Sequence, residues 1–199
     1  EKSDFIILLK QLRVHQWSKN LLLFIPAFTS HQLLSPGVFI NAMQAFFAFS
    51  LLASSIYILN DLADINYDRK HPKKKYRPIA SGDLSIFKAY VYMLFCFLGG
   101  ILISFNQGLT FLMLAGIYIA LNLLYSFYLK KVIILDVIIL MSFYTLRLIA
   151  GHVPDEVPLS PWLLSFSIFL FFSLGLLKRY VDTIVIRENN ETLISGRGY

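Results

Sequence analysis

Long apolar runs separated by polar or Pro- and Gly-containing segments dominate the chain. A helix needs roughly 20 apolar residues to cross a bilayer, and six stretches reach or approach that length. The first stretch is short, and an amphipathic segment at residues 5–20 precedes it. We expect that segment to lie at the membrane interface and then to turn inward. The pattern predicts an all-α polytopic bundle forming a single domain over residues 1–199, with spans at Leu21–Leu34, Pro36–Leu59, Ile86–Phe105, Leu109–Leu129, Val132–Gly151 and Pro161–Leu177.

The composition supports a membrane protein and argues against other classes. Hydrophobic residues make up 57% of the 199 positions, whereas soluble domains average about 45–50%. The one cysteine, Cys96, lies in an apolar run, so it cannot form a disulfide within the chain, and we expect a small buried hydrophobe there. The four histidines show no zinc-ligand spacing. The net charge of +6 is accompanied by no nucleic-acid-binding motif, which excludes that class of partner.

The distribution of Lys and Arg gives the orientation. Seventeen of the 18 fall before the first span, after the last span, or in or just beyond alternate connections, and the other connections contain none. By the positive-inside rule the Lys- and Arg-rich side is cytoplasmic. The exception is Arg147, within the fifth predicted span. It shares a helical face with Asp136 to within about 20°, about 16 Å further along the axis. Both a structural and a functional role remain open for Arg147.

The sharpest polar motif ends the second predicted span and reads Asn60-Asp61-Leu62-Ala63-Asp64-Ile65-Asn66-Tyr67-Asp68. If the helix continues through the motif, Asp61, Asp64 and Asp68 fall within about 60° of one another on one face. Three such carboxylates repel one another unless a cation lies among them. Oxygen ligands suit Mg²⁺, which binds through one or two carboxylates plus substrate phosphates. We therefore expect these three aspartates to be metal ligands and catalytic residues, with Asn60 binding substrate.

A basic segment follows directly and reads His71-Pro72-Lys73-Lys74-Lys75-Tyr76-Arg77-Pro78-Ile79-Ala80. Metal-binding carboxylates next to Lys and Arg suit a diphosphate ester, because the metal neutralises the leaving diphosphate while the cations bind its outer oxygens. We expect Lys74, Lys75 and Arg77 to bind substrate. The alternative is that the basic loop only sets topology and the acids form a solvated helix end.

Other polar residues fall at the same predicted level of the membrane. Tyr125 and Lys130 close the fourth predicted span and Asp136 opens the fifth, so that all three could line one cavity. We add three cations to the candidate substrate-binding residues, one before the first span and two after the sixth: Lys19, Lys178 and Arg179.

The motifs together resemble the UbiA superfamily of intramembrane prenyltransferases, and most closely its decaprenyl-phosphate phosphoribosyltransferase branch. The resemblance covers nearly the whole chain. Two departures accompany it: the region from Asp182 to Glu191 lacks a clean second Asp-x-x-x-Asp motif, and about three helices of the nine-helix family fold are missing, which suggests a truncated chain. The matching segments are Asn60-Asp61-x-x-Asp64-x-x-x-Asp68, Gln16-Trp17-x-Lys19-Asn20, His71-Pro72-x-Lys74-Lys75-x-Arg77-Pro78, Tyr125-Ser126-x-x-x-Lys130, Leu135-Asp136-Val137, Leu146-Arg147 and Lys178-Arg179.

The resemblance implies an Mg²⁺-dependent transferase in a bacterial inner membrane, with its site open to the cytoplasm. The phosphoribosyl branch implies transfer of 5-phosphoribose from phosphoribosyl diphosphate to a polyprenyl phosphate lipid. An alternative is transfer of a polyprenyl group from its diphosphate to an aromatic or other acceptor. A third possibility is a non-enzymatic transporter or scaffold, although a transporter would place more charge near the membrane midplane.

Overall fold

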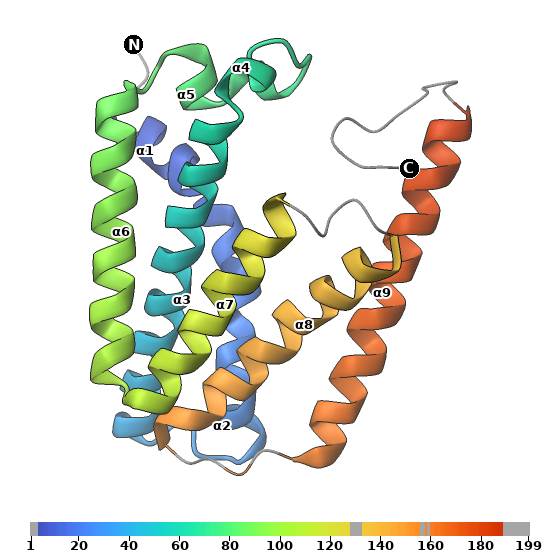
Figure 1. Ribbon diagram of the computed structural model, residues 1–199. Helices are drawn as coiled ribbons and strands as arrows, with labels where there is room; N and C mark the ends of the chain where they lie inside the picture. Colours follow the sequence, from blue (N-terminus) through green and yellow to red (C-terminus); the bar gives the residue numbers. More distant parts are fainter. Residues whose placement is uncertain (1–3, 128–132, 156–157, 159, 189–199) are drawn as a thin grey trace.

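Five long helices build the protein, and shorter helical segments join them. The computed structural model describes residues 4–127, 133–155, 158 and 160–188, and these residues contain helices but no strand. The long helices are α3 (Pro36–Ala63), α6 (Ile86–Asn106), α7 (Leu109–Phe127), α8 (Ile133–His152) and α9 (Pro161–Glu188), all of them long and apolar enough to cross a membrane. Helices α3 and α6 run the length of the bundle, whereas α7 and the oblique α8 cover only part of it, and α9 packs beside α8 (Figure 1). The predicted all-α bundle is confirmed.

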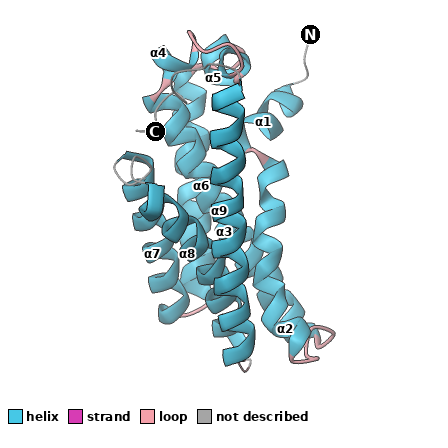
Figure 2. Cartoon of the chain, turned by 90° about the vertical axis from the view of Figure 1, so that its right-hand side faces the viewer, coloured by secondary structure: helices cyan, strands magenta, loops and turns pink. Residues whose placement is uncertain are grey.

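The N-terminal segment differs from its prediction. It consists of α1 (Asp4–Leu12), the 3₁₀ helix η1 (Val14–Phe24) and α2 (Ile25–Thr29), which together run from one end of the bundle to the other (Figures 1 and 2). The predicted span at Leu21–Leu34 is therefore wrong in its limits, whereas the segment at residues 5–20 combines exposed side chains such as Phe5 and Ile6 with a few buried ones. Gln11 and Asn20 are both 1% exposed, because η1 packs against α3 and α8. The amphipathic pattern places these polar side chains against other helices.

Helix α3 is the centre of the bundle. It begins at Pro36, which suits the first turn because proline has no N–H to leave unpaired. In α3, 61% of an 18-residue apolar stretch is buried, compared with 17% of the corresponding stretch in α6 and 11% of that in α9. Small side chains along α3, including Ala45 and Ala48, are fully buried and let neighbouring helices approach closely.

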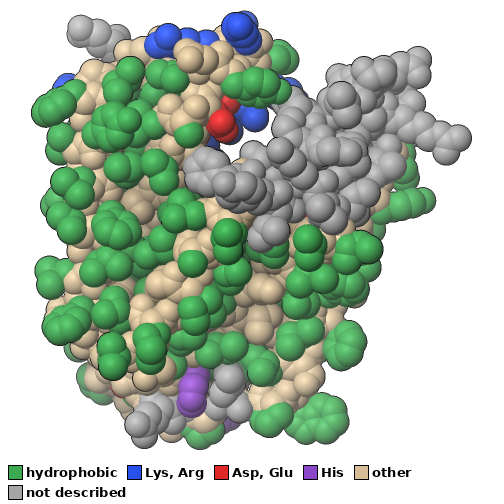
Figure 3. Space-filling view, viewed as in Figure 1, with side chains coloured by type: hydrophobic (Ala, Val, Ile, Leu, Met, Phe, Trp, Pro, Cys, Tyr) green, Lys and Arg blue, Asp and Glu red, His purple; other side chains and the backbone are tan. Residues whose placement is uncertain are grey.

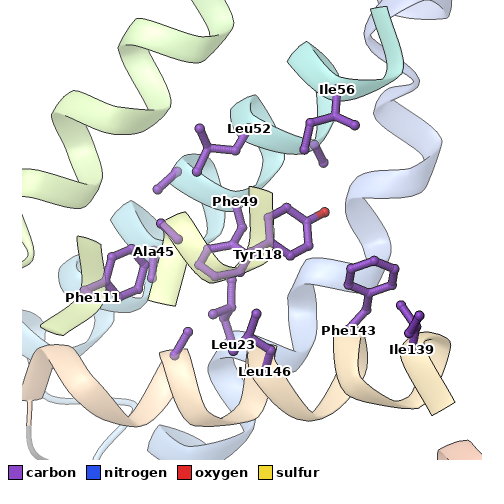
Figure 4. Packing of buried hydrophobic residues seen from close by; sticks show 14 residues of the cluster. Leu23, Ala45, Phe49, Leu52, Ile56, Phe111, Tyr118, Ile139, Phe143 and Leu146 are labelled. Atoms are coloured by element: carbon purple, nitrogen blue, oxygen red, sulfur yellow. The ribbon is translucent and has the colours of Figure 1, made fainter. Parts of the chain in front are cut away.

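Aromatic and aliphatic side chains from four elements form the main core (Figure 4). Phe49 of α3 packs against Phe111 and Tyr118 of α7, with ring centroids 5.6 and 4.9 Å apart. Leu23 of η1 and Leu146 of α8 close the cluster. Cys96 of α6 is buried, as expected, at 3% exposure.

The outer faces are apolar. Large hydrophobic side chains cover the sides of the molecule, and Lys and Arg gather at the end where α4 and α5 lie (Figure 3). We call this the charged end: α4 (Ile65–Asp68), η2 (Lys74–Tyr76), α5 (Pro78–Ser81) and the loops between them. Exposed apolar faces carry no penalty in lipid, whose tails are as apolar as leucine. Examples are Phe87 and Phe95 on α6 and Trp162 and Phe169 on α9.

Candidate active site

The aspartate motif lies where α3 ends, and the helix does not continue through it. Helix α3 stops at Ala63, and Asp64 (φ −96°, ψ 10°) separates it from α4. The Asp64 N–H still donates to the carbonyl of Asn60 at 3.0 Å, while the Asp64 carbonyl accepts from the N–H of Asp68 at 2.8 Å. The expectation of three carboxylates on one continuous helical face is therefore wrong. Asp61 and Asp68 still meet at Arg77, whereas Asp64 is exposed.

Asp61 is buried at 3% exposure and faces the N-terminal segment. Its carboxylate accepts from Arg13 at 2.6 Å, Arg77 at 3.0 Å and Gln11 at 3.1 Å. These donors come from the start of the chain and from the charged end. Asp61 thus joins α1, η1 and the loop before α5 to α3.

Asp68 is fully buried, and one of its oxygens lacks a hydrogen-bond donor. Oδ2 accepts from Arg77 at 2.6 Å. Oδ1 has no hydrogen-bond partner among the described residues, and its closest cation is Lys74 Nζ at 4.0 Å. A buried acceptor without a donor is costly, so Asp68 Oδ1 is suited to receive a cation or a donor from a ligand.

Arg77 holds Asp61 and Asp68 together through one nitrogen, NH1. The residue before a proline favours extended backbone, and Arg77 precedes Pro78 with φ −67° and ψ 142°. Pro78 starts α5, and Gly82 ends it in the left-handed region at φ 89°, where glycine has no steric penalty. The short helix thereby fixes the direction of Arg77.

Asp64 is exposed, and no described side chain hydrogen-bonds to its carboxylate. In the same part of the chain, no group of three or more Asp, Glu, His or Cys side chains lies close enough to hold a metal ion. The residues still fit Mg²⁺ in part, because Asp68 has an unpartnered oxygen and Asp64 is accessible. Asn60 lies one helical turn before Asp64 and can add an amide oxygen.

A polar pocket opens beside Asn60, whose amide donates to Ser126 Oγ at 3.0 Å. It has a volume of about 210 Å³ and lies between η1, α3, α7 and α8. Three predicted site residues, Lys19, Asn60 and Tyr125, line it, whereas the three aspartates do not. The described lining residues are Lys19, Tyr57, Asn60, Tyr118, Asn122, Tyr125, Ser126, Leu140, Phe143, Tyr144 and Arg147.

Arg147 forms the deep wall of this pocket and is 5% exposed. Its guanidinium donates to Asn20 Oδ1 at 2.7 Å, to the Phe143 carbonyl at 2.6 Å and to the Tyr118 hydroxyl at 3.1 Å. It also lies over the Tyr118 ring at 5.0 Å. The intramembrane arginine therefore faces the bundle interior, as polar groups in membranes usually do.

Asp136 is engaged elsewhere and does not line the pocket. It is fully buried, forms an ion pair with Arg179 of α9, and accepts from the Tyr125 hydroxyl at 2.7 Å. The predicted cavity shared by Tyr125, Lys130 and Asp136 is therefore wrong for Asp136, which contacts the pocket only through Tyr125. Lys130 lies outside the described residues, as does the side chain of Asp182.

The remaining predicted cations are not brought together. Lys178 is exposed on α9. Lys75 lies over the exposed Tyr76 ring at 5.1 Å, away from the buried aspartates. Lys74 and Arg77 are the members of the basic loop that reach a carboxylate.

Several site residues were not found from the sequence. Arg13 and Gln11 belong to a segment assigned to the interface, and their polarity within an amphipathic pattern was the available signal. Tyr118, Asn122 and Tyr144 fall inside apolar runs, where an isolated polar group among apolar neighbours indicates the bundle interior.

An all-α bundle of five long apolar helices, with apolar sides and charged groups at one end, has the architecture of a polytopic membrane protein. The chain belongs to the UbiA prenyltransferase family, whose model matches residues 22–183. The fold agrees with two solved relatives. One is a UbiA homolog from Archaeoglobus fulgidus bound to DMAPP and Mg²⁺, with a TM-score of 0.69, 18% identity, and coverage of 83% of this chain and 60% of that one. The other is a digeranylgeranylglyceryl phosphate synthase, with a TM-score of 0.74 and 18% identity, and the match covers 96% of this chain and 67% of that one.

Similarity in sequence extends to three curated relatives. An uncharacterized protein of Sinorhizobium fredii is 40% identical over 96% of this chain and 37% of its own length. The nodulation protein NoeC of Azorhizobium caulinodans is 33% identical over 100% of this chain and 64% of its own length. The decaprenyl-phosphate phosphoribosyltransferase of Mycolicibacterium smegmatis is 36% identical over 88% and 56%. The chain thus spans between about one third and two thirds of the length of these relatives.

Proposed function

We propose that the whole protein transfers 5-phosphoribose from phosphoribosyl diphosphate to a polyprenyl phosphate at the cytoplasmic face of a bacterial inner membrane. The observation that carries the proposal is the arrangement around Asp68. Its oxygen Oδ1 is buried without a donor, while Arg77 and Lys74 lie beside it. Arg77 also holds Asp61, the residue next to Asn60 at the pocket. An acidic and a basic group side by side suit a metal-bound diphosphate.

Relatives support this choice of donor. Four curated decaprenyl-phosphate phosphoribosyltransferases are 32% to 36% identical to the chain over 87% to 89% of its length. Membership in a family of transferases favours an enzyme over a transporter or scaffold. The charged groups also gather mainly at one end of the bundle (Figure 3). A transporter would instead place more of them near the midplane of the membrane.

The surroundings of the three aspartates support different roles for them, one in positioning and two in binding the metal ion. Asp61 already accepts from three protein donors, so we assign it to positioning Arg13 and Arg77. Asp64 and Asp68, with the amide oxygen of Asn60, would hold Mg²⁺. When bound, Mg²⁺ would neutralise charge on the leaving diphosphate. The solved Archaeoglobus fulgidus relative with DMAPP carries the same ion.

The chain's own residues would bind and orient the reactants. Arg77 and Lys74, which lie beside Asp68, would donate to diphosphate oxygens, and Lys130 would join them. A phosphate oxygen of the lipid would attack C1 of the ribose while the C1–O bond to diphosphate breaks, and the electron pair would leave with the diphosphate. No proton moves in this step, so positioning and electrostatic stabilisation would supply most of the rate enhancement.

Prenyl transfer to an aromatic or other acceptor is the second candidate. Solved relatives of the same fold are bound to the prenyl diphosphates DMAPP and GPP. A second pocket of about 240 Å³ between α3, α6 and α7 is almost entirely apolar and would suit a hydrocarbon chain. Its lining is Ser55, Ile56, Leu59, Met93, Leu94, Phe97, Ile119 and Leu123.

A donor assay on the purified full-length protein separates the two functions. Phosphoribosyl diphosphate and a polyprenyl diphosphate are each supplied with polyprenyl phosphate or 4-hydroxybenzoate, with Mg²⁺ or with EDTA, and diphosphate release is measured. We expect release only from phosphoribosyl diphosphate, only with polyprenyl phosphate and only with Mg²⁺. Release from the polyprenyl diphosphate alone would establish the second function instead. The Asp64→Asn variant serves as the inactive control.

A further inference from the structure

Among the residues that the structure describes, two cationic side chains and no acidic one line the pocket beside Asn60. Lys19 enters from η1 and Arg147 from α8. Lys19 forms no ion pair with any carboxylate in the described part of the chain. Arg147, Lys178 and Arg13 are all close enough to repel its ammonium. The described lining of the pocket therefore carries an excess of positive charge, with Arg147 buried and Lys19 exposed at its rim.

The contacts of Arg147 leave its charge uncompensated. Its three protein acceptors are an amide oxygen, a backbone carbonyl and a phenol, all of them neutral. A guanidinium has five N–H groups, so within the described residues two remain for a ligand. Tyr118 and Tyr144 lie against its face, at 5.0 and 6.0 Å from the ring centroids. These contacts fix the direction of Arg147 without neutralising it.

The nearby acids are committed to other cations. Asp136 pairs with Arg179 and accepts from Tyr125, and Asp61 pairs with Arg13 and Arg77. Turning either carboxylate toward Lys19 would break a close ion pair that it already forms, with Arg179 or with Arg13. Among the described residues, no carboxylate in the pocket lining pairs with Lys19 or Arg147, so the pocket suits an anionic ligand.

We propose that Lys19 and Arg147 form a binding site for a phosphate monoester, separate from the diphosphate site at Asp68 and Arg77. The inference rests on the proposed function, in which two reactants carry such a group: the 5-phosphate of the donor and the phosphate of the lipid acceptor. A pocket of about 210 Å³ is smaller than the roughly 300–1,000 Å³ of sites for drug-sized ligands, so it suits a compact group. The lining hydroxyl and amide groups of Tyr57, Asn122 and Tyr144 can donate to further phosphate oxygens.

This site would also select the donor. Phosphoribosyl diphosphate carries anionic groups at both ends, whereas a prenyl diphosphate carries charge at one end and hydrocarbon at the other. Two cations in the pocket favour the first molecule and disfavour the tail of the second, because burying them against hydrocarbon leaves both unpaired. Lys19 and Arg147 are thus specificity-determining residues for the proposed reaction.

Binding without turnover tests the site. Full-length protein in detergent with EDTA is titrated calorimetrically with ribose 5-phosphate, with farnesyl phosphate and with 4-hydroxybenzoate. The Lys19→Gln variant removes one cation from an accessible side chain, and Arg147→Lys keeps the buried charge but loses the fork of N–H groups. The exposed Lys88→Gln on α6 is the matched control. Circular dichroism and thermal unfolding verify that each variant folds.

We expect one or both phosphate monoesters to bind, and Lys19→Gln to weaken that binding about tenfold to a hundredfold, while Lys88→Gln leaves it unchanged. If the binding of ribose 5-phosphate depends on Lys19, the site belongs to the donor. If the binding of farnesyl phosphate depends on Lys19, the site belongs to the lipid acceptor. Equal binding by wild type and a folded Lys19→Gln variant would overturn the proposal, and so would Lys19-dependent binding of 4-hydroxybenzoate alone. If Lys19-dependent binding persists while wild type releases no diphosphate, the proposed function fails and the phosphate site stands.

Discussion

Arg13 donates to Asp61 across 2.6 Å, although 48 residues separate them in the chain. Arg13 holds a left-handed backbone conformation (φ 52°, ψ 46°) between α1 and η1, which costs a non-glycine residue about 1–2 kcal/mol. The bond to Asp61 and the contact with the Tyr57 ring at 4.8 Å offset that strain. The bend in the N-terminal segment is therefore held by the end of α3.

Replacing Arg13 should loosen this junction. We expect Arg13→Ala to lower the free energy of unfolding by about 1–3 kcal/mol, because a buried carboxylate loses one charged donor but keeps Arg77 and Gln11. Thermal unfolding of the detergent-solubilised protein measures the effect. Lys70→Ala, at an exposed position of the charged end, is the control and should stay within about 0.5 kcal/mol of wild type. Equal melting temperatures for the two variants would contradict the role given to Arg13.

Substituting Asp61 should mainly affect stability, whereas substituting Asp64 should mainly affect activity. Asp61→Asn should reduce stability by about 1–3 kcal/mol, since it breaks the charge pairing with Arg13 and Arg77. Asp64→Asn should leave the melting temperature unchanged, because Asp64 is exposed and bonds to no described side chain. Diphosphate release should nevertheless fall by about 100-fold or more in Asp64→Asn. An active Asp64→Asn enzyme would remove Asp64 from the proposed metal site.

The ion pair between Asp136 and Arg179 ties α8 to α9 and is almost fully shielded from solvent. We expect Arg179→Ala to cost about 3–5 kcal/mol, because it leaves a buried carboxylate without its cation. The neighbouring Lys178→Ala is the matched comparison, since that side chain is exposed, and it should change stability by less than about 0.5 kcal/mol. Chemical denaturation of both variants provides the measurement. A milder loss in Arg179→Ala than in Lys178→Ala would show that the pair does not hold α9.

Close helix contacts depend on Gly151. A Cβ atom at this position of α8 would lie against the backbone of Leu23 in η1, with the Leu23 Cα only 2.9 Å away. Gly151→Ala should therefore separate α8 from η1 and lower the melting temperature. Gly116→Ala on α7 should be tolerated, because nothing lies within 4 Å of its added methyl group. The two substitutions are chemically identical, so similar melting temperatures would exclude the close approach described here.

The long helices were predictable because their signal is local. The predicted span Pro36–Leu59 starts where α3 starts, and Ile86–Phe105 and Pro161–Leu177 start where α6 and α9 start. A proline at the first turn or a serine before it marks each start. The end of α9 extends to Glu188, beyond the prediction, because polar residues at a membrane surface remain compatible with a helix.

The site was less predictable because its geometry depends on distant partners. Helical periodicity placed Asp61 with Asp64 and Asp68, but the helix breaks at Asp64, and no local pattern signals that break. The direction of Asp61 is set by Arg13 and Gln11, which lie about 50 residues earlier. The basic loop was identified from its composition, yet only the structure shows that Arg77 joins two carboxylates while Lys75 does not. The charged residues in a sequence indicate the kind of chemistry at a site. Which acid pairs with which cation depends on tertiary contacts.

The donors to Asp61 also bear on how this protein could be shortened. The family match starts at residue 22, so a version trimmed to residues 22–183 would retain every long helix yet omit Gln11, Arg13 and Lys19. It would insert into a bilayer and leave the acid at the end of α3 with Arg77 as its remaining donor. The first twenty residues therefore complete the surroundings of Asp61 and should be kept whenever homologues are aligned, truncated or fused at the amino terminus.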